Sequence, residues 1–364
     1  MTTPGTGQTR DPTLRAALRE DLRQGGFWQN LRKEWVELRE FSIDEGKRTT
    51  LAAMGPVKRG FYVSWWILKQ MILRLTPVRR LLLVAGLVLL LISDSVRTDS
   101  AHAQPYIGAA LLLFVLLLEL KDRLLATDEL ESGRTVQRAL MPDQNPQVPG
   151  WSLWLYSRSA NEVGGDLVDY LTLGPSRLAV VLADVSGKGL KAALLMAKLQ
   201  TIIRTLAPDF PSIARLGAKI NEVFRRDGLP NVFASMIYVE LSPDSQDLRF
   251  INAGHLPPLI LRGDGIHETP KGDPALGLMN ITTYTEQTVA CDHGDVLLGY
   301  SDGLTEARNI QGEFFGNERL LALLPSLRAL SAPGIGTRLT EELDRFVGEA
   351  HRHDDLTLIV LKRL

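Results

Sequence analysis

Four aspartates in the carboxy-terminal part of the chain lie where an apolar segment meets a glycine-rich or polar turn. They are Asp166 in NEVGGDLVDY, Asp184 in LADVSGKG, Asp302 in LLGYSDGLTEA and Asp354 in HRHDDLTLIVL. A carboxylate at the end of a buried strand must be hydrogen-bonded, paired or bound to a metal, because desolvating an isolated charge is unfavourable. Each aspartate alone also fits a simpler interpretation, since Asp-Gly and Asp-Ser are ordinary turn formers.

Taken together, the four carboxylates predict a site for hard divalent cations. Magnesium and manganese prefer carboxylate, carbonyl and water oxygens, and they need no cluster of cysteine or histidine. Two such ions can share a water molecule, lower its pKa and direct it at a phosphorus atom. A glycine pair precedes Asp166, and glycines follow Asp184 and Asp302, so backbone and substrate can approach closely.

These aspartates require strands and turns that hold them. Residues 178–197 (LAVVLADVSGKGLKAALLMA) predict a buried strand, a tight turn and a helix, with Asp184 at the turn. Similar patterns predict strands at 152–158, 177–183, 233–241, 247–252, 258–262, 284–289, 295–300 and 356–362. Helices are predicted at 189–206, 212–226, 317–326 and 334–347. Adjacent strands with helices inserted irregularly favour an α+β layered fold.

The first part of the chain has a different pattern. Residues 81–92 and 106–118 are almost purely aliphatic, and basic residues flank the pair on both outer sides. Each run is shorter than the roughly 18 to 20 residues of a spanning helix, so a buried or re-entrant hairpin is the alternative. We expect a transmembrane hairpin, with both termini in the cytoplasm. Residues 61–75 are rich in aromatic side chains and are compatible with a helix lying along a membrane surface.

This pattern divides the chain into four segments. Residues 1–76 form a helical region of unknown role, 77–120 the transmembrane hairpin, 121–145 a linker helix and 146–364 the catalytic domain. The helix at 119–140 can act as a rod or a homodimer seam, and a plain solvated connector is equally allowed. The run MPDQNPQVPG ends this helix and marks the boundary of the catalytic domain.

Composition excludes several classes of protein. The 364-residue chain has 41 basic and 42 acidic residues, which argues against a dedicated nucleic-acid binder. Its single cysteine, Cys291, can form neither an intramolecular disulfide nor a cysteine-rich metal site, which fits a reducing compartment. The first residues lack the pattern of a signal peptide, so none is expected.

Eight blocks in the second half of the chain resemble those of a known family. They are VGGDLVDY, ADVSGKGLKAALLMA, FASMIYVEL, INAGHLPPLIL, ALGL, GDVLLGYSDGLTEARN, FFG and HDDLTLIVL. In this order they are similar to the SpoIIE-like, RsbU-type branch of the metal-dependent (2C-type) protein serine/threonine phosphatases. The preceding VQRALMP resembles the short helix that leads into that domain. The resemblance covers roughly residues 135–364 and none of the first 120.

The resemblance implies a β-sandwich flanked by helices, with two manganese or magnesium ions at one end. Asp184 would bridge both ions. The implied metal ligands are Asp166, Asp184, the backbone carbonyl of Val185, Asp302 and Asp354.

The resemblance suggests supporting roles for several other residues, and each also has a structural alternative. Asp355 would support the site from outside the ligands, and Asp169 is a candidate for an outer or third-metal role. Lys188 could orient phosphate or be a solvated turn residue. His255 is expected to be a structural hydrogen-bonding residue. Weaker candidates are Arg158 for gripping phosphate and His351 and His353 as general acids.

The sequence thus predicts a membrane-anchored phosphoserine/phosphothreonine protein phosphatase that uses water activated by two metal ions. By resemblance, its substrate would be a phosphorylated anti-sigma-factor antagonist in bacterial partner-switching signalling. The alternative is a pseudophosphatase, in which the same fold is a membrane-tethered binding module. A two-metal nuclease or nucleotide phosphohydrolase is disfavoured by the neutral charge and the lack of an aromatic-basic pattern.

Overall fold

The computed structural model describes residues 54–93, 104–174, 176–243, 245–280 and 283–364. The chain divides into two compact units with the boundary between Arg123 and Leu124. The described elements of the first unit are helix α4 (Pro56–Arg74), helix α5 (Pro77–Ser93) and the first part of helix α6 (Gln104–Leu140). The predictions for residues 1–53 lie outside the described residues.

The two predicted apolar segments are helical, and they lie in α5 and α6. In the described residues, however, no helix combines the length and the apolar character that crossing a bilayer requires. Helix α5 has 17 residues, and the apolar run of α6 ends in the charged side chains of Glu119, Lys121 and Asp122. A spanning helix needs about 20 predominantly apolar residues. The predicted transmembrane hairpin at 77–120 is therefore not supported.

The second unit is built on two sheets whose strands pair antiparallel. Within the described residues each sheet has five strands. The first has the order β1 (Trp151–Arg158), β10 (Leu356–Arg363), β9 (Val296–Tyr300), β6 (Leu259–Arg262) and β7 (Gly265–Glu268). The second has the order β2 (Asp166–Thr172), β3 (Leu178–Val185), β4 (Ala234–Leu241), β5 (Asp247–Ala253) and β8 (Gln287–Ala290).

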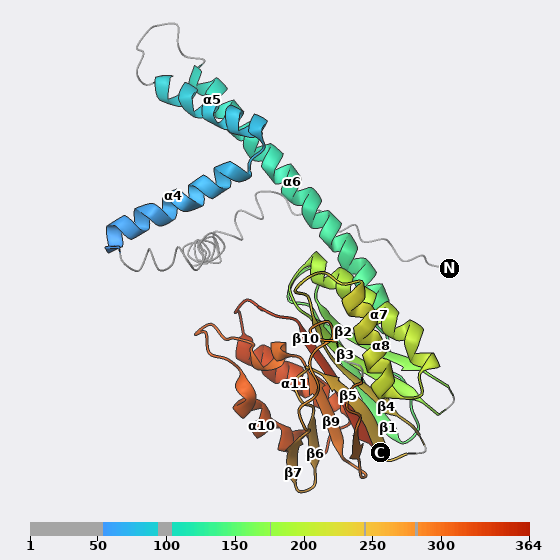
Figure 1. The fold of residues 1–364 in the computed structure, drawn as a ribbon. Coiled ribbons are helices and arrows are strands. Elements are labelled where there is room, and N and C mark those ends of the chain that lie inside the picture. The colour runs from blue at the N-terminus through green and yellow to red at the C-terminus, as the bar shows by residue number, and fades with distance from the viewer. Residues whose placement is uncertain (1–53, 94–103, 175, 244, 281–282) are drawn as a thin grey trace, which may run out of the picture. The chain divides into compact units, whose positions relative to one another are not determined.

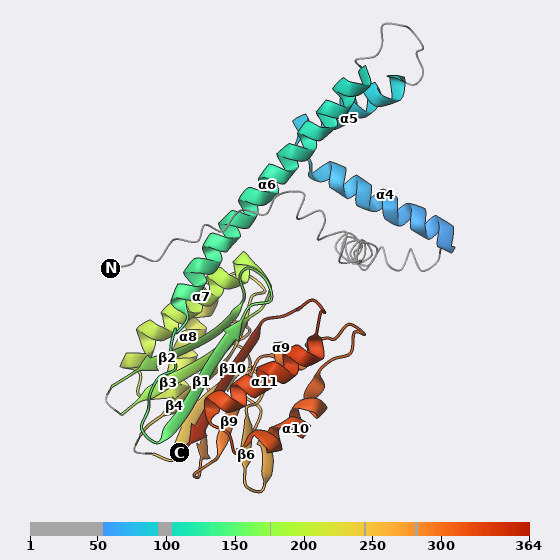
Figure 2. The same ribbon diagram turned by 180° about the vertical axis from the view of Figure 1, so that it is seen from behind.

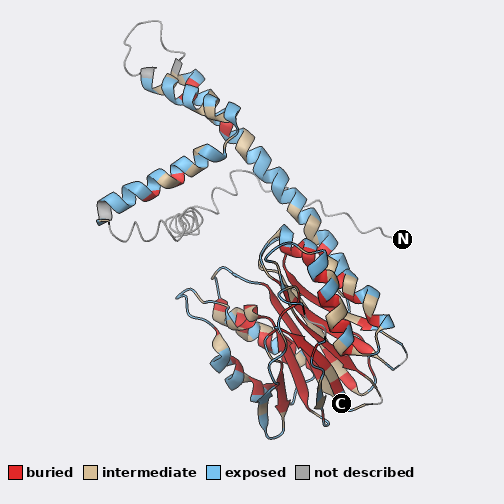
Figure 3. Ribbon diagram, viewed as in Figure 1, coloured by how far each residue is buried: buried red, intermediate tan, exposed pale blue. Residues whose placement is uncertain are grey.

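Helices cover the outer face of each sheet, which confirms the predicted α+β layered fold. Helices α7 (Leu190–Leu206) and α8 (Ile213–Arg226) pack on the second sheet. Helices α10 (Gly316–Leu327) and α11 (Ala332–Val347) pack on the first (Figures 1 and 2). One apolar core lies between the two sheets, and another lies under each helical layer. Strands β2, β3, β4, β9 and β10 are accordingly buried along most of their length (Figure 3).

The helices form where the sequence places apolar residues at helical spacing. In α8 the buried residues include Ile213, Leu216, Ile220 and Phe224, which lie on one face. Ser212 begins this helix, because its side chain accepts a hydrogen bond from the backbone N–H of Arg215 at 3.4 Å.

Two strands were not predicted, and one begins later than expected. Strand β2 carries two aspartates, which are depleted in strands, and β7 is a short, mostly exposed hairpin strand. The strand predicted at 284–289 is observed as Gln287–Ala290. Strand β2 matters for function because its first residue is Asp166.

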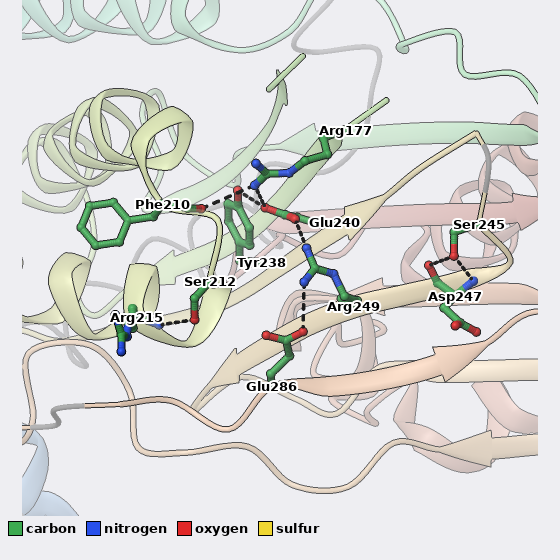
Figure 4. A network of polar contacts seen from close by, with 10 residues as sticks. All are labelled: Arg177, Phe210, Ser212, Arg215, Tyr238, Glu240, Ser245, Asp247, Arg249 and Glu286. Atoms are coloured by element: carbon green, nitrogen blue, oxygen red, sulfur yellow. Dashed lines mark hydrogen bonds and ion pairs between the residues drawn. The ribbon is translucent and has the colours of Figure 1, made fainter. Parts of the chain in front are cut away.

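An ion-pair network stabilises the second sheet at one end (Figure 4). The buried carboxylate of Glu240 accepts hydrogen bonds from Arg177 and Arg249, both at 2.7 Å, and a bond of 3.3 Å from the hydroxyl of Tyr238. Glu240 pairs with Ala179 across β3 and β4, five residues from the Ser235–Asp184 pair in the same register. The network therefore lies at the opposite end of these strands from Asp184.

Candidate active site

Asp166 and Asp184 lie directly opposite each other on the paired strands β2 and β3. Side chains of directly opposed residues lie on the same face of a sheet, with Cβ atoms about 5 Å apart. Val168 and Leu182, two residues along each strand, belong to the core between the sheets, so both carboxylates point into the sandwich at its end. Two sequence-predicted site residues are thus brought together by strand register.

The carboxyl group of Asp166 is buried and incompletely satisfied. Asp166 is 4% exposed, and its Oδ2 atom has no hydrogen-bond partner. Burial, and then the neighbouring Asp184, raise the pKa of Asp166 well above its ordinary value, although hydrogen bonds with Thr357 and Ser301 act in the other direction. A buried acceptor oxygen without a donor is what a bound cation would satisfy.

Asp184 is close to three further carboxylates. Burial, followed by the charges of Asp302, Asp354 and Asp355 in that order of effect, raises the pKa of Asp184 to about 6. Burial, followed by the charge of Asp354, also raises the pKa of Asp302. The predicted ligands from β2, β3, the turn after β9 and the loop before β10 therefore form one electrostatically coupled group.

Short local structures position the other two aspartates. Asp302 is the first residue of the single-turn helix α9 (Asp302–Thr305), which follows strand β9. Its neighbour Ser301 is held to β10, because it donates a backbone hydrogen bond to Thr357 O at 2.9 Å and accepts one from Thr357 N at 2.9 Å. Asp354 lies in the loop just before β10 and is exposed.

Both carboxylate oxygens of Asp355 accept hydrogen bonds from the backbone of the loop that precedes Asp166. Its Oδ1 accepts a hydrogen bond from the backbone N–H of Ala160 at 2.8 Å, and its Oδ2 accepts one from Gly165 at 2.8 Å. Burial raises the pKa of Asp355, and these backbone donors oppose the increase. Asp355 therefore connects the loop before β10 to the glycine pair before Asp166.

The glycines beside Asp166 and Asp302 lie in close contact with neighbouring loops. A Cβ atom on Gly164 would lie 2.2 Å from Asp355 Oδ2, and one on Gly303 would lie 1.9 Å from the carbonyl oxygen of Asp355. At Gly165 a Cβ would lie 2.8 Å from the carbonyl oxygen of Val185. Any side chain at these positions would displace the loops that hold the carboxylates.

Lys188 contacts a predicted ligand. Its Nζ atom lies 3.1 Å from Asp354 Oδ2 and donates a hydrogen bond to the carbonyl oxygen of His353 at 2.6 Å. Lys188 thus connects the turn after β3 with the loop before β10. Both side chains of the ion pair are substantially exposed, so the pair contributes little to stability by itself.

Asp169 lies apart from the other carboxylates. It is three residues after Asp166 on β2, so its side chain projects from the opposite face of the sheet. There it forms two hydrogen bonds with Arg204 at 2.6 and 2.7 Å and one with Gln200 at 2.9 Å, both on α7. Through these contacts Asp169 attaches helix α7 to strand β2, which is the structural alternative that the sequence also allowed.

One residue that the sequence did not single out contacts the GGD segment directly. Gln137, in the last turn of α6, is buried and donates a hydrogen bond from Nε2 to Gly164 O at 2.8 Å. Its Oε1 accepts a bond from Gly164 N at 3.1 Å. The sequence pointed to Gln137 only through its place in VQRALMP, one turn before the end of the helix. Sequence spacing alone does not reveal a hydrogen-bond partner 27 residues away.

His255 is a structural residue, as predicted. Its Nε2 lies 3.1 Å from the carbonyl oxygen of Tyr300, which can only accept, so Nε2 carries the proton. Its Nδ1 therefore accepts from the hydroxyl of Ser235 at 2.7 Å. Burial lowers the pKa of His255 to about 4, which keeps the ring neutral near pH 7.

The remaining candidates surround a small pocket beside Asp354. Arg158 forms a bidentate pair with Asp344 of α11 at 2.8 and 3.0 Å, so its role here is to join β1 to α11. His351 and His353 are exposed in the loop before β10. The lining residues that carry charge or can acquire it are Arg158, Glu306, Arg308, His351, Arg352, His353 and Asp354.

The donor set fits hard divalent cations. It consists of carboxylate oxygens and a nearby backbone carbonyl, and one carboxylate oxygen, Oδ2 of Asp166, is buried without a partner. The carboxylates are coupled, but in the described residues no group of three or more His, Cys, Asp or Glu side chains is already arranged as a complete metal site.

Comparison with known proteins supports the assignment of the fold. Residues 174–364 match the family model of stage II sporulation protein E (SpoIIE). Protein IcfG of Synechocystis is 28% identical over 263 residues, covering 65% of this chain and 41% of that protein. Phosphoserine phosphatase RsbU of Bacillus subtilis is 25% identical over 237 residues, covering 65% of this chain and 70% of RsbU. The chain thus spans well under two thirds of the length of IcfG.

Two solved structures share the fold. The RsbU and RsbW domains of a Mycobacterium tuberculosis protein match with a TM-score of 0.51 at 27% identity, over 60% of this chain and 61% of that one. The SiaA-PP2C domain of Pseudomonas aeruginosa matches with a TM-score of 0.59 at 20% identity, over 67% of this chain and 98% of that domain. The second unit therefore has the 2C-type phosphatase fold. Because the family model covers more than half of the 364 residues, the chain belongs to the SpoIIE family.

Proposed function

We propose that this protein is a manganese- or magnesium-dependent phosphoserine/phosphothreonine protein phosphatase. The observation that carries the proposal is the register pair Asp166–Asp184, in which one carboxylate is buried with an unpartnered oxygen and the other adjoins two more aspartates. Such a concentration of buried negative charge is unfavourable unless cations neutralise it. Membership of a family in which RsbU and RsbP are named phosphoserine phosphatases supports the same activity.

Each side chain has a specific role in this proposal. Asp184 would contact both ions, and the other ligands would be Asp166, the carbonyl of Val185, Asp302 and Asp354. Bound ions of this kind activate water as a nucleophile and neutralise charge that develops on a phosphoryl group. The chain itself holds the ligands in place: Asp355 fixes the GGD segment, and Lys188 holds Asp354 until a cation competes for its carboxylate.

The proposed substrate is a phosphorylated anti-sigma-factor antagonist of a partner-switching pathway. The relatives RsbU and RsbP, and the natural combination of RsbU and RsbW domains in one solved protein, support this class of substrate. The pocket beside Asp354 has a mixed charge: Arg308 and Arg352 could contact an anionic segment of a protein substrate, while Glu306 and Asp354 are acidic and Arg352 also pairs with Asp344.

The linker part of α6 suggests an assembly for this enzyme. Leu125 and Val136 are exposed on one side of α6, eleven residues apart, and these apolar side chains are compatible with the predicted homodimer seam between two linker helices.

A binding module without catalytic activity is the second candidate. It is favoured by the ion pair of Lys188 with Asp354, which occupies one predicted ligand. A module of this kind would bind the phosphorylated partner with no requirement for manganese.

A metal titration of the full chain distinguishes these candidates. The purified protein, stripped with a chelator, is assayed on a serine-phosphorylated antagonist protein with increasing manganese, beside the variant Asp184→Asn. The enzyme releases phosphate only with metal, and the variant loses nearly all of this activity. Metal-independent binding of the phosphoprotein with no phosphate release would identify a binding module. Full manganese-dependent activity in Asp184→Asn would exclude the proposed site.

A further inference from the structure

The first unit exposes apolar surface on helices that are otherwise rich in basic residues. In residues 54–93 the sequence contains no acidic residue and six basic ones: Lys58, Arg59, Lys69, Arg74, Arg79 and Arg80. Helices α4, α5 and the start of α6 are exposed over much of their length (Figure 3). The exposed residues nevertheless include many leucine, valine and aromatic side chains. Soluble proteins rarely leave such apolar surface uncovered unless it binds something.

Helices α5 and α6 pack closely through two glycines. A Cβ atom on Gly108 would lie 2.8 Å from the carbonyl oxygen of Gly86, and one on Gly86 would lie 3.1 Å from that of Gly108. Contact between backbones at small residues is the packing mode that helices use where lipid replaces water. Arg79, near the start of α5, joins the two helices through ion pairs with Glu119 and Asp122 of α6, both at 2.7 Å.

The outer face of this helix pair also carries apolar side chains. Leu81, Val84, Val88 and Leu91 recur at helical spacing on α5 and are 43–70% exposed. On α6, Tyr106, Ile107, Leu113, Phe114 and Leu117 are exposed in the same way. A helix that is apolar all round requires an apolar surrounding, either a protein core or a membrane.

Helix α4 has the pattern of a helix that lies in a membrane interface. Phe61, Trp65 and Leu68 are exposed at 70%, 52% and 49%, and their spacing places them on one face. Lys58 and Lys69 are exposed along the border of this face, eleven residues apart, which is close to three helical turns. Lysine side chains in this position can extend toward anionic headgroups while aromatic side chains enter the boundary with the acyl chains.

The corner between α4 and α5 is held by protein contacts. Arg80 donates hydrogen bonds to the carbonyl oxygens of Leu75 at 2.9 Å and Leu73 at 2.5 Å, at the carboxyl end of α4. Arg79 and Arg80 are therefore used within the unit, whereas Lys58, Arg59 and Lys69 stand exposed. The exposed cations lie on the helix that carries the aromatic face.

We infer that α4 and the α5–α6 pair form a lipid-binding surface whose partner is the anionic face of a phospholipid bilayer. Three independent observations favour lipid: the apolar outer face, the glycine-mediated packing and the exclusively cationic charge of residues 54–93. This inference does not depend on phosphatase activity. It gives the predicted location at the cell membrane a specific physical basis.

Flotation of the full chain with vesicles tests the inference. The protein is mixed with vesicles of phosphatidylcholine alone or of phosphatidylcholine with phosphatidylglycerol, and the floating fraction is measured. We expect recovery with both and stronger binding to the anionic vesicles. Lys58→Gln with Lys69→Gln should weaken binding to anionic vesicles on the order of fivefold per lysine and leave binding to neutral vesicles unchanged.

Matched substitutions locate the surface. Val84→Glu with Val88→Glu, on the outer face of α5, should abolish flotation. The control pair Leu321→Glu with Leu330→Glu places the same charges on exposed leucines of the second unit and should float like the parent. Circular dichroism and phosphatase assays check that each variant is folded.

Two results would overturn the inference. In the first, the parent protein stays out of the floating fraction with both vesicle types. If Val84→Glu with Val88→Glu then dissociates an oligomer, the apolar face is a protein–protein interface. The other is a Val84→Glu/Val88→Glu variant that floats as well as the parent.

Discussion

Gln137 forms two hydrogen bonds with the peptide groups of Gly164, at 2.8 Å to the carbonyl and 3.1 Å from the amide, two residues before Asp166. The last turn of α6 is thereby attached to the segment that carries a proposed metal ligand. Because both bonds are buried, their loss leaves polar peptide groups unsatisfied.

Gln137→Ala should therefore weaken the proposed site. We expect a loss of about 1 to 3 kcal/mol in the free energy of unfolding and a higher manganese concentration for half-maximal activity. Denaturant unfolding and a manganese titration measure the two effects. Thr135→Ala, on the exposed side of the same helix, is the matched control and should change neither. Equal behaviour of the two variants would show that the Gln137 bonds do not position the site.

Asp169 and Asp184 should respond oppositely to the same substitution. Asp169→Asn breaks the bidentate pair with Arg204, so we expect the free energy of unfolding to fall by about 1 to 3 kcal/mol, with manganese binding retained. Asp184→Asn removes repulsion among carboxylates, so the metal-free protein should be as stable as the parent or more stable, with manganese binding lost. Thermal unfolding and calorimetric manganese titration of both variants check the contrast. If Asp169→Asn lost manganese binding while its stability stayed unchanged, Asp169 would be part of the metal site.

Stability of the metal-free protein should depend on pH through Asp184. The folded state raises the pKa of Asp184 from 3.8 to about 6, so it holds the proton more tightly than the unfolded chain does. The associated stability is complete below pH about 4 and is lost as the pH rises through about 6, an effect of about 3 kcal/mol at most. Unfolding of the parent and of Asp184→Asn is compared between pH 4 and 7, and the difference should grow with pH in favour of the variant.

The comparison of the parent with Asp184→Asn is needed because His255 also makes stability depend on pH. Its pKa is lowered to about 4, so the stability that its neutral ring contributes is present above its ordinary value of 6.5 and is lost as the pH falls toward 4. This contribution is the same in both proteins and cancels. Parallel pH profiles for parent and variant would contradict the raised pKa of Asp184.

Lys188→Met separates a role in holding Asp354 from a role in binding phosphate. The ion pair is exposed, so the free energy of unfolding should change by less than about 1 kcal/mol. If Lys188 holds Asp354, the substitution frees the carboxylate and shifts the manganese dependence, while KM for the phosphoprotein at saturating manganese stays unchanged. A rise in KM with unaltered manganese dependence would instead mean that Lys188 contacts substrate.

The two glycines at positions 303 and 133 should tolerate alanine very differently. Gly303→Ala places a Cβ atom 1.9 Å from the carbonyl oxygen of Asp355, so the turn must move and activity should fall at least about tenfold. Gly133, within α6, meets only ordinary contacts at 3.7 Å from Val163 and 3.9 Å from Leu190, so Gly133→Ala should stabilise the helix by about 0.5 to 1 kcal/mol. Activity and thermal unfolding are measured for both, and an active Gly303→Ala would mean that the turn is not closely packed.

The sequence determined most elements of the second unit and the residue types of its site. Apolar periodicity located α7, α8, α10 and α11 to within two residues, because a helix that covers a sheet must bury one face. The apolar run before Asp184 located β3 for a similar reason, since a strand buried on both faces is apolar throughout.

Tertiary structure decided which of these residues meet. Asp166 and Asp169 occur in one motif, but strand geometry directs them to opposite faces, and only the packing of α7 supplies Arg204 to one of them. The contact of Lys188 with Asp354 joins residues 166 positions apart, which depends on how the two sheets align. Local sequence preferences contain no information on such distant pairs. The four aspartates and their glycines were therefore readable from the chain, whereas their grouping around the Asp166–Asp184 pair required the folded sandwich.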